Sequence, residues 1–132
     1  MTTELNLVAT ADGLARVAGD EAVLLDLPFR DVAELLAAGE GLEPARRARE
    51  RGRVPLAGLA LRAPLAASRA LWGVGMNYHS KARLTGRPVP DEPVLYLKAP
   101  SAVSAPGAEV ELPQDRSAQV DYEGEVAFVV GR

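Results

Sequence analysis

The chain has 132 residues, of which 48% are hydrophobic and 25% are charged, and its formal net charge is −3 at pH 7. This composition argues against a disordered chain, because enough apolar material is present to offset the entropy lost on ordering. The absence of cysteine excludes disulfides, thiolate catalysis and Cys-based zinc sites. A nucleic-acid partner has little support, because the one dense basic stretch, 46–53, follows the pattern of a solvated helix face.

The first residues of the chain and its pattern of hydropathy indicate where in the cell the protein is expected. Residues 1–4 show neither the positive charge nor the apolar run of a secretory signal. Arg62 and Arg69 interrupt the most apolar stretch, so no run reaches membrane-spanning length. We therefore expect a cytoplasmic protein with no membrane partner.

Residues 4–27 predict a small β-meander. Short apolar runs in this segment are separated by turn residues at 10–13 and 19–20. This alternation of strand-like runs and turn signals is typical of successive antiparallel hairpins.

Two helices are expected next. The first covers residues 31–38, where Asp31 is a favourable N-cap and Glu34 completes a capping-box pattern. The second covers residues 44–51 and is opened by its proline at position 44.

Residues 54–70 read as a connector punctuated by two prolines. Helical periodicity and capping signals end here, and strands punctuated by Gly and Pro follow. We therefore place a domain boundary near Ser68, which gives a small N-terminal domain at residues 1–68 and a second domain at residues 69–132.

The second part predicts strands, so the fold class is α+β. Apolar runs indicate strands at residues 71–76, 94–97, 109–112 and 120–130. Residues 79–93 are polar and proline-rich, which predicts a loop that includes one helical turn near Ala82. Gly73 in the first of these strands indicates a bend or a close approach of another group to the backbone.

The last predicted strand carries the clearest chemical signal. Side chains alternate between the two faces of a strand, so Asp121, Glu123 and Glu125 should share one face. Three carboxylates this close repel each other, and oxygen ligands favour a hard ion such as Mg²⁺, Mn²⁺ or Ca²⁺. The alternative is the solvated face of an antiparallel strand. Gly124, which removes a side chain from the opposite face, favours a close approach there.

Several motifs agree in order and spacing with one known family. They are Gly73 to Tyr78, Thr85 to Lys98, Pro106-Gly107, Leu112-Pro113, Val120 to Glu125 and Val129 to Arg132. Together they resemble the opening of the catalytic domain of the fumarylacetoacetate hydrolase family. The resemblance implies the first strands of a β-rich catalytic fold, preceded by the family's small N-terminal domain. It also implies that Glu123 and Glu125 bind a divalent metal, while the family's third ligand, an aspartate, would follow Arg132.

The chain departs from the family pattern at the acid/base group. Family hydrolases read Asn-Tyr-x-x-His-Ala-x-Glu, and here Lys81 stands at the His position and Leu84 at the Glu position. The histidine of this chain, His79, lies two residues earlier. His79 and Lys81 are therefore both candidate catalytic residues, since a lysine can also act as a base or hold an anion.

The resemblance implies an enzyme that acts on a small keto acid or acylpyruvate-like substrate. Hydrolysis of a C–C bond, decarboxylation and isomerisation all pass through a metal-chelated enolate and stay open as reaction types. The alternative is a non-catalytic truncated fragment, or one half of a split enzyme that needs a partner chain. A further alternative is a plain α+β domain with an acidic strand face. We expect a homodimer or a complementing C-terminal segment, and little activity from the chain alone.

Overall fold

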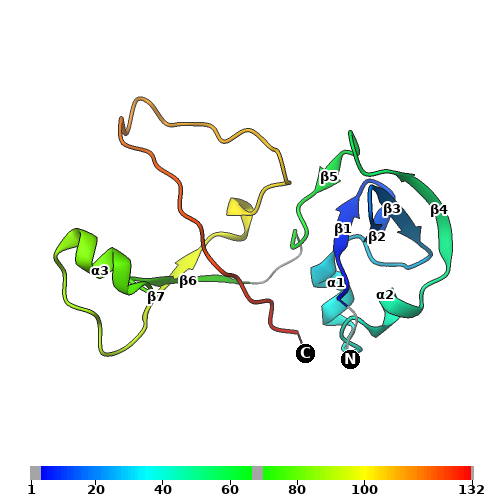
Figure 1. Cartoon of the computed structure of the whole chain (residues 1–132), viewed down its shortest axis with the longest axis horizontal. Helices are drawn as coiled ribbons and strands as arrows, with labels where there is room; N and C mark the ends of the chain where they lie inside the picture. The colour runs from blue at the N-terminus through cyan, green and yellow to red at the C-terminus, as the bar shows by residue number, and fades with distance from the viewer. Residues whose placement is uncertain (1–3, 67–69, 132) are drawn as a thin grey trace.

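The computed structural model describes residues 4–66 and 70–131, which form two antiparallel sheets (Figure 1). The larger sheet has the strand order β4-β3-β2-β1-β5 and the smaller one pairs β6 with β7. The strands of the larger sheet are β1 (Leu7–Thr10), β2 (Gly13–Ala18), β3 (Glu21–Leu25), β4 (Glu50–Pro55) and β5 (Leu61–Arg62). Short helices combined with antiparallel sheets make this an α+β structure, as the sequence predicts.

The meander forms where its turn residues predict it. Thr10 closes the first turn, since its hydroxyl accepts a hydrogen bond from the Asp12 amide (3.1 Å) and donates one to the Gly13 carbonyl (2.9 Å). Gly13 and Gly19 have φ angles of 105° and 63°, a left-handed region that residues with side chains rarely adopt. Local chemistry therefore sets the register of β1, β2 and β3.

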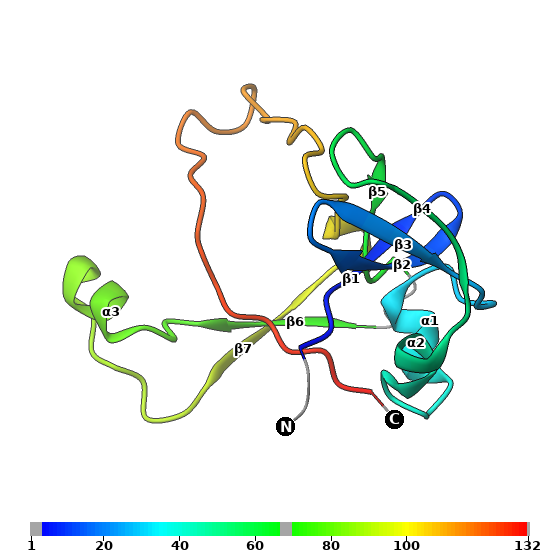
Figure 2. The same ribbon diagram turned by 45° about the vertical axis from the view of Figure 1, so that its right-hand side comes forward.

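Two helices lie against this sheet, α1 (Val32–Ala37) and α2 (Glu43–Arg47) (Figure 2). Asp31 caps α1 as predicted, because its carboxylate accepts a hydrogen bond from the Glu34 amide at 2.8 Å. The helices bury apolar side chains against the strands. The buried cluster consists of Ala9, Leu14, Leu25, Leu35 and Ala45.

The predicted helix over 44–51 is wrong at its C-terminal end. Helix α2 stops at Arg47, and β4 begins at Glu50 and pairs with β3. Arg53 of β4 forms ion pairs with Glu21 of β3 (3.4 Å) and with Glu50 (3.0 Å). Pairing with a strand distant in sequence outweighs the helical preference of this charged stretch.

The smaller sheet is a hairpin of β6 (Leu71–Gly75) and β7 (Val94–Lys98), which confirms two predicted strands. Between them, the predicted helical turn near Ala82 is a helix, α3 (His79–Thr85). It ends at Gly86, whose φ of 64° is the left-handed C-terminal conformation that glycine favours. A short 3₁₀ turn, η1 (Pro100–Ala102), follows the hairpin.

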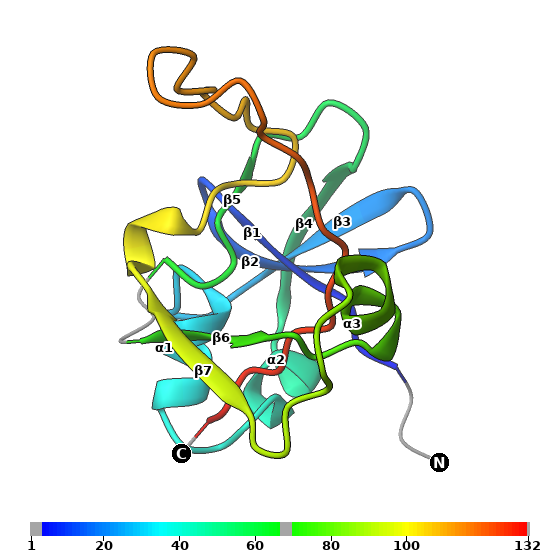
Figure 3. The same cartoon turned by 90° about the vertical axis from the view of Figure 1, so that its left-hand side faces the viewer.

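The strands predicted at 109–112 and 120–130 are not formed. Both segments are irregular and exposed, and within the described residues no strand pairs with them. A strand exists only when a neighbour satisfies its backbone groups, and an apolar run alone supplies no neighbour. The second segment crosses the β6–β7 hairpin and reaches α1, where Gly131 approaches Leu36 (Figures 1 and 3).

The domain boundary predicted near Ser68 lies outside the described residues and stays a prediction. In the parts that are described, no helix combines the length and the apolar character needed to cross a membrane.

Candidate functional site

A cavity of about 100 Å³ lies where α3, the β6–β7 hairpin and residues 123–125 meet. Its lining consists of Val74, Gly75, Met76, Asn77, Tyr78, Lys81, Tyr96, Glu123, Gly124 and Glu125. The cavity therefore gathers Lys81 and both predicted metal ligands, although 42 positions separate Lys81 from Glu123.

The turn from β6 into α3 places Lys81 over this cavity. Met76 has a φ of 53°, a left-handed conformation that is uncommon for a residue with a side chain and often occurs at functional sites. The chain then enters α3, and the Lys81 amide donates to the Tyr78 carbonyl at 2.9 Å. Lys81 thus projects from the first turn of the helix.

Lys81 and Glu123 form a direct ion pair. The Lys81 Nζ donates to Glu123 Oε1 at 2.9 Å, and both side chains are about half exposed (44% and 57%). Hydrogen bonding to Glu123, together with its negative charge and that of Asp121, raises the pKa of Lys81. The same hydrogen bond and charge, with a smaller contribution from Lys98, lower the pKa of Glu123.

Glu125 lines the cavity beside Glu123, while Tyr122 between Asp121 and Glu123 is 96% exposed. Asp121 is not part of the lining and acts on Lys81 only through its charge. The close approach predicted at Gly124 is wrong, because a Cβ placed there would meet nothing within 4 Å.

The carboxylate oxygens of the cavity are the kind of ligand that a hard divalent ion prefers, but the cavity supplies only a few of them. Carboxylate oxygens are what Mg²⁺ and Mn²⁺ prefer, and Mg²⁺ commonly binds through one or two carboxylates and several waters. Across residues 4–66 and 70–131, no three His, Cys, Asp or Glu side chains come together as a ligand group. Glu123 and Glu125 could therefore hold an ion with water completing its coordination.

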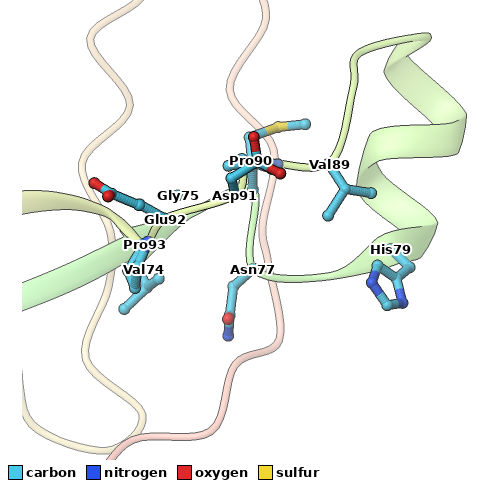
Figure 4. A pocket seen from close by; sticks show the side chains of 10 residues that line it. Val74, Gly75, Asn77, His79, Val89, Pro90, Asp91, Glu92 and Pro93 are labelled. Atoms are coloured by element: carbon cyan, nitrogen blue, oxygen red, sulfur yellow. The ribbon is translucent and has the colours of Figure 1, made fainter.

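His79 lies in an adjoining cavity of about 260 Å³, which shares the lining residues Val74 to Asn77 with the cavity of the glutamates (Figure 4). This cavity is bounded by β6, the start of α3 and the loop carrying Asp91 and Glu92. In Figure 4 the imidazole of His79 stands apart from both carboxylates. Of the two candidate catalytic residues, the structure thus brings Lys81, and not His79, into the cavity of the glutamates.

Tyr96 is a further residue of the glutamate cavity and was not among the predicted site residues. Tyr96 lies directly opposite Gly73 in the hairpin, and a Cβ placed on Gly73 would overlap the tyrosine ring. Of the bend or close approach predicted at Gly73, the structure shows the close approach, and that glycine was the signal from which Tyr96 could have been found.

The hairpin, α3 and the two glutamates form a continuous part of the chain that matches a known family. The profile described as "Fumarylacetoacetate (FAA) hydrolase C-terminal" matches residues 70–132. These residues belong to the fumarylacetoacetate hydrolase family. All residues of the glutamate cavity fall within the matched part.

Individual relatives extend this similarity. Oxaloacetate tautomerase fahd2, mitochondrial, from Xenopus laevis is 33% identical over 109 residues, which are 80% of this chain and 34% of that protein. An uncharacterised protein of Pyrococcus horikoshii is 45% identical over 56 residues, 42% of this chain and 24% of that protein. The chain therefore spans about a third or less of these curated relatives.

A solved structure resembles a longer part of the chain than the family profile matches. The crystal structure of a candidate HpcE protein from Mycobacterium smegmatis superposes with a TM-score of 0.67 at 26% identity. It covers 81% of this chain and 40% of the other. The superposition therefore extends beyond residues 70–132 into the N-terminal part of the chain.

Proposed function

We propose that the protein is a divalent-metal-dependent enzyme that acts on a small keto acid or acylpyruvate-like substrate. The observation that carries the proposal is the cavity that joins Glu123 and Glu125 to a lysine, in the part of the chain that belongs to the fumarylacetoacetate hydrolase family. The similarity to an oxaloacetate tautomerase supports a keto acid as substrate. A cytoplasmic location is part of the same proposal.

In this proposal Glu123 and Glu125 hold Mg²⁺, or Mn²⁺ or Ca²⁺ in its place. The bound ion supplies Lewis-acid stabilisation of negative charge on a keto acid. The Lys81 ammonium, a cation on the wall of the same cavity, attracts a substrate carboxylate. For proton transfer, Lys81 and His79 are both candidate acid/base groups, and His79 would have to act from the neighbouring cavity.

Among the reaction types, isomerisation by proton movement has the best support. Hydrolysis requires an activated water, and the position where family hydrolases carry the glutamate of their dyad is Leu84, an apolar side chain that is 84% exposed. Tautomerisation moves a proton and breaks no C–C bond, so it needs no activated water. The Xenopus laevis relative, named as a tautomerase, supports the same choice.

A complementing partner is the second part of the proposal. Residues 70–131 expose many large apolar side chains, and such exposure is typical of a surface that another chain or segment covers. The most exposed are Leu84, Val110, Tyr122, Val126, Phe128 and Val130, each at 74% or more. A second copy or a complementing segment would cover them and would supply strands to pair with residues 109–112 and 120–130. Without such a partner, we expect the chain to bind the ion weakly and to turn over no substrate. If the chain stays inactive with every partner, the alternative that it is a non-catalytic fragment is favoured.

Calorimetric titration with Mn²⁺ tests the site. The chain and the variant Glu123→Gln/Glu125→Gln are compared, and we expect the variant to lose at least tenfold in affinity, about 1.4 kcal/mol. The matched control is Glu109→Gln/Glu111→Gln, an exposed pair with the same spacing and the same charge change. Equal affinities in all three proteins would place the ion elsewhere. Turnover of oxaloacetate, with and without a complementing segment, tests the reaction.

A further inference from the structure

Glu123, one of the two carboxylates proposed to bind the divalent ion, already forms an ion pair with the ammonium group of Lys81. Lys81 Nζ lies 2.9 Å from Glu123 Oε1, whereas Glu125 has no ion-pair partner among the described residues. The two glutamates of the cavity are therefore unequal, and the difference is a lysine that belongs to the same cavity.

An ammonium and a divalent ion oppose each other at this carboxylate. A Mg²⁺ ion binds a carboxylate oxygen at about 2.0–2.1 Å, which would put it within a few ångströms of the Lys81 ammonium. Like charges at that separation repel, and solvent weakens the repulsion at half-exposed groups without removing it. Binding of the divalent ion to Glu123 therefore disfavours the ion pair between Glu123 and Lys81. Equally, the ion pair disfavours binding of the ion.

The same ion pair connects two segments of the chain. Lys81 lies on α3 and Glu123 on the irregular segment 120–131. Over the residues that the structure describes, no other hydrogen bond or ion pair joins α3 to that segment. Loss of this contact would therefore free α3 from the glutamates.

We propose that Lys81 is an internal counter-cation that competes with the divalent ion for Glu123 and is released when the ion binds. The inference rests on the proposed function, in which Glu123 and Glu125 hold the ion. It adds a consequence that this function alone does not carry: Lys81 weakens ion binding, and ion binding detaches α3 from segment 120–131. Released from Glu123, the ammonium becomes available to an anionic ligand of the cavity.

Calorimetric titration of the full chain with Mn²⁺ alone tests the competition. Lys81→Met should bind Mn²⁺ about twofold to fivefold more tightly than the unmodified chain, since an exposed ion pair is a weak interaction and its loss removes a weak competitor. The matched control is Lys98→Met, which removes a charge that acts on Glu123 without a direct bond, and its gain should be smaller. Equal or weaker binding by Lys81→Met overturns the inference.

The variant Glu123→Gln separates failure of the inference from failure of the function. If Glu123→Gln loses affinity while Lys81→Met matches the unmodified chain, the ion site stands and the competition is wrong. If Glu123→Gln binds Mn²⁺ unchanged, the ion does not use this carboxylate, and both proposals fall.

A Mg²⁺ titration followed by NMR tests the release. The lysine side-chain signals of Lys81 should move toward those of a free lysine, and the amides of α3 should shift with the same midpoint. In Lys81→Met the shifts of the α3 amides should be largely lost. Signals of Lys81 and α3 that stay in place while Mg²⁺ binds would overturn the release.

Discussion

Gly73 and Tyr96 show how a single residue shapes the candidate site. They are direct partners in the hairpin, where side chains on paired strands lie close together. The tyrosine ring occupies the volume that a side chain on Gly73 would need, and Tyr96 also lines the cavity of Glu123 and Glu125. The absence of one side chain therefore decides where an aromatic wall of the cavity stands.

Gly73→Ala should displace the Tyr96 ring. The added methyl group overlaps the ring, so contacts between position 73 and the ring, seen as NMR cross-relaxation, should disappear. Overpacking costs about 1 kcal/mol at the low end, which should lower hydrogen-exchange protection of the hairpin about fivefold. Gly52→Ala is the control, because a Cβ on Gly52 meets open space. Retained ring contacts and unchanged protection would contradict the packing.

Helix α1 shows how the start of an element depends on two carboxylates. Asp31 accepts from the Glu34 amide, and Glu34 in turn accepts from the Arg30 amide at 2.7 Å and from Arg30 Nε at 3.1 Å. The pattern differs from the predicted capping box by one residue, since Glu34 reaches the residue before the N-cap. The hydrogen bond from the Arg30 amide is the main cause that lowers the pKa of Glu34.

Acid should weaken the start of α1. The pKa of Glu34 is lower in the folded chain than in the unfolded one, so its contribution to stability is present above the unfolded pKa, about 4.3, and is lost as the pH falls through the folded pKa. An NMR titration of the Glu34 side-chain carbon should give a midpoint below that of an unfolded peptide. Arg30→Ala should keep part of the lowering, because it retains the backbone amide and loses only the contributions of the Arg30 side chain. A midpoint at or above the peptide value would refute the assignment.

At the element scale, prediction succeeded where the signals are local. The meander and the cap at Asp31 depend on residues within a few positions of each other, so the sequence alone reveals them. Strand β4 was missed because its identity depends on the edge of β3, about 30 positions earlier along the chain. The spacing of charged residues along 46–53 fits a helix as well as it fits a strand. The presence of β3 as a pairing partner decides in favour of a strand.

The core of the molecule is unevenly distributed. Eight of the nine buried hydrophobic residues of the described chain lie between Ala9 and Ala45, and the ninth is Ala82. Residues 70–131 expose their large apolar side chains instead. We therefore expect the first part to be stable by itself and the second part to need a partner, as the proposed boundary near residue 68 requires.

A fragment of residues 1–66 should fold cooperatively, and a fragment of residues 70–132 should not. Circular dichroism and urea unfolding of each fragment measure this. Leu35→Ala in the first fragment should cost about 2–5 kcal/mol, because Leu35 is fully buried in the cluster that joins α1 to the sheet. An unfolded first fragment, or a second fragment with a cooperative transition, would remove the boundary.

The sequence by itself determined the meander, the capped helix, the hairpin strands and the family, because each depends on short-range spacing. The tertiary structure decided which side chains meet. It joined Lys81 to Glu123, placed His79 in a different cavity and, within the part of the chain that is described, left residues 120–130 without a partner strand. The physical reason is that strand pairing and ion pairing depend on which distant segments come together, and that choice is made by packing of the whole chain and not by the spacing of its neighbours.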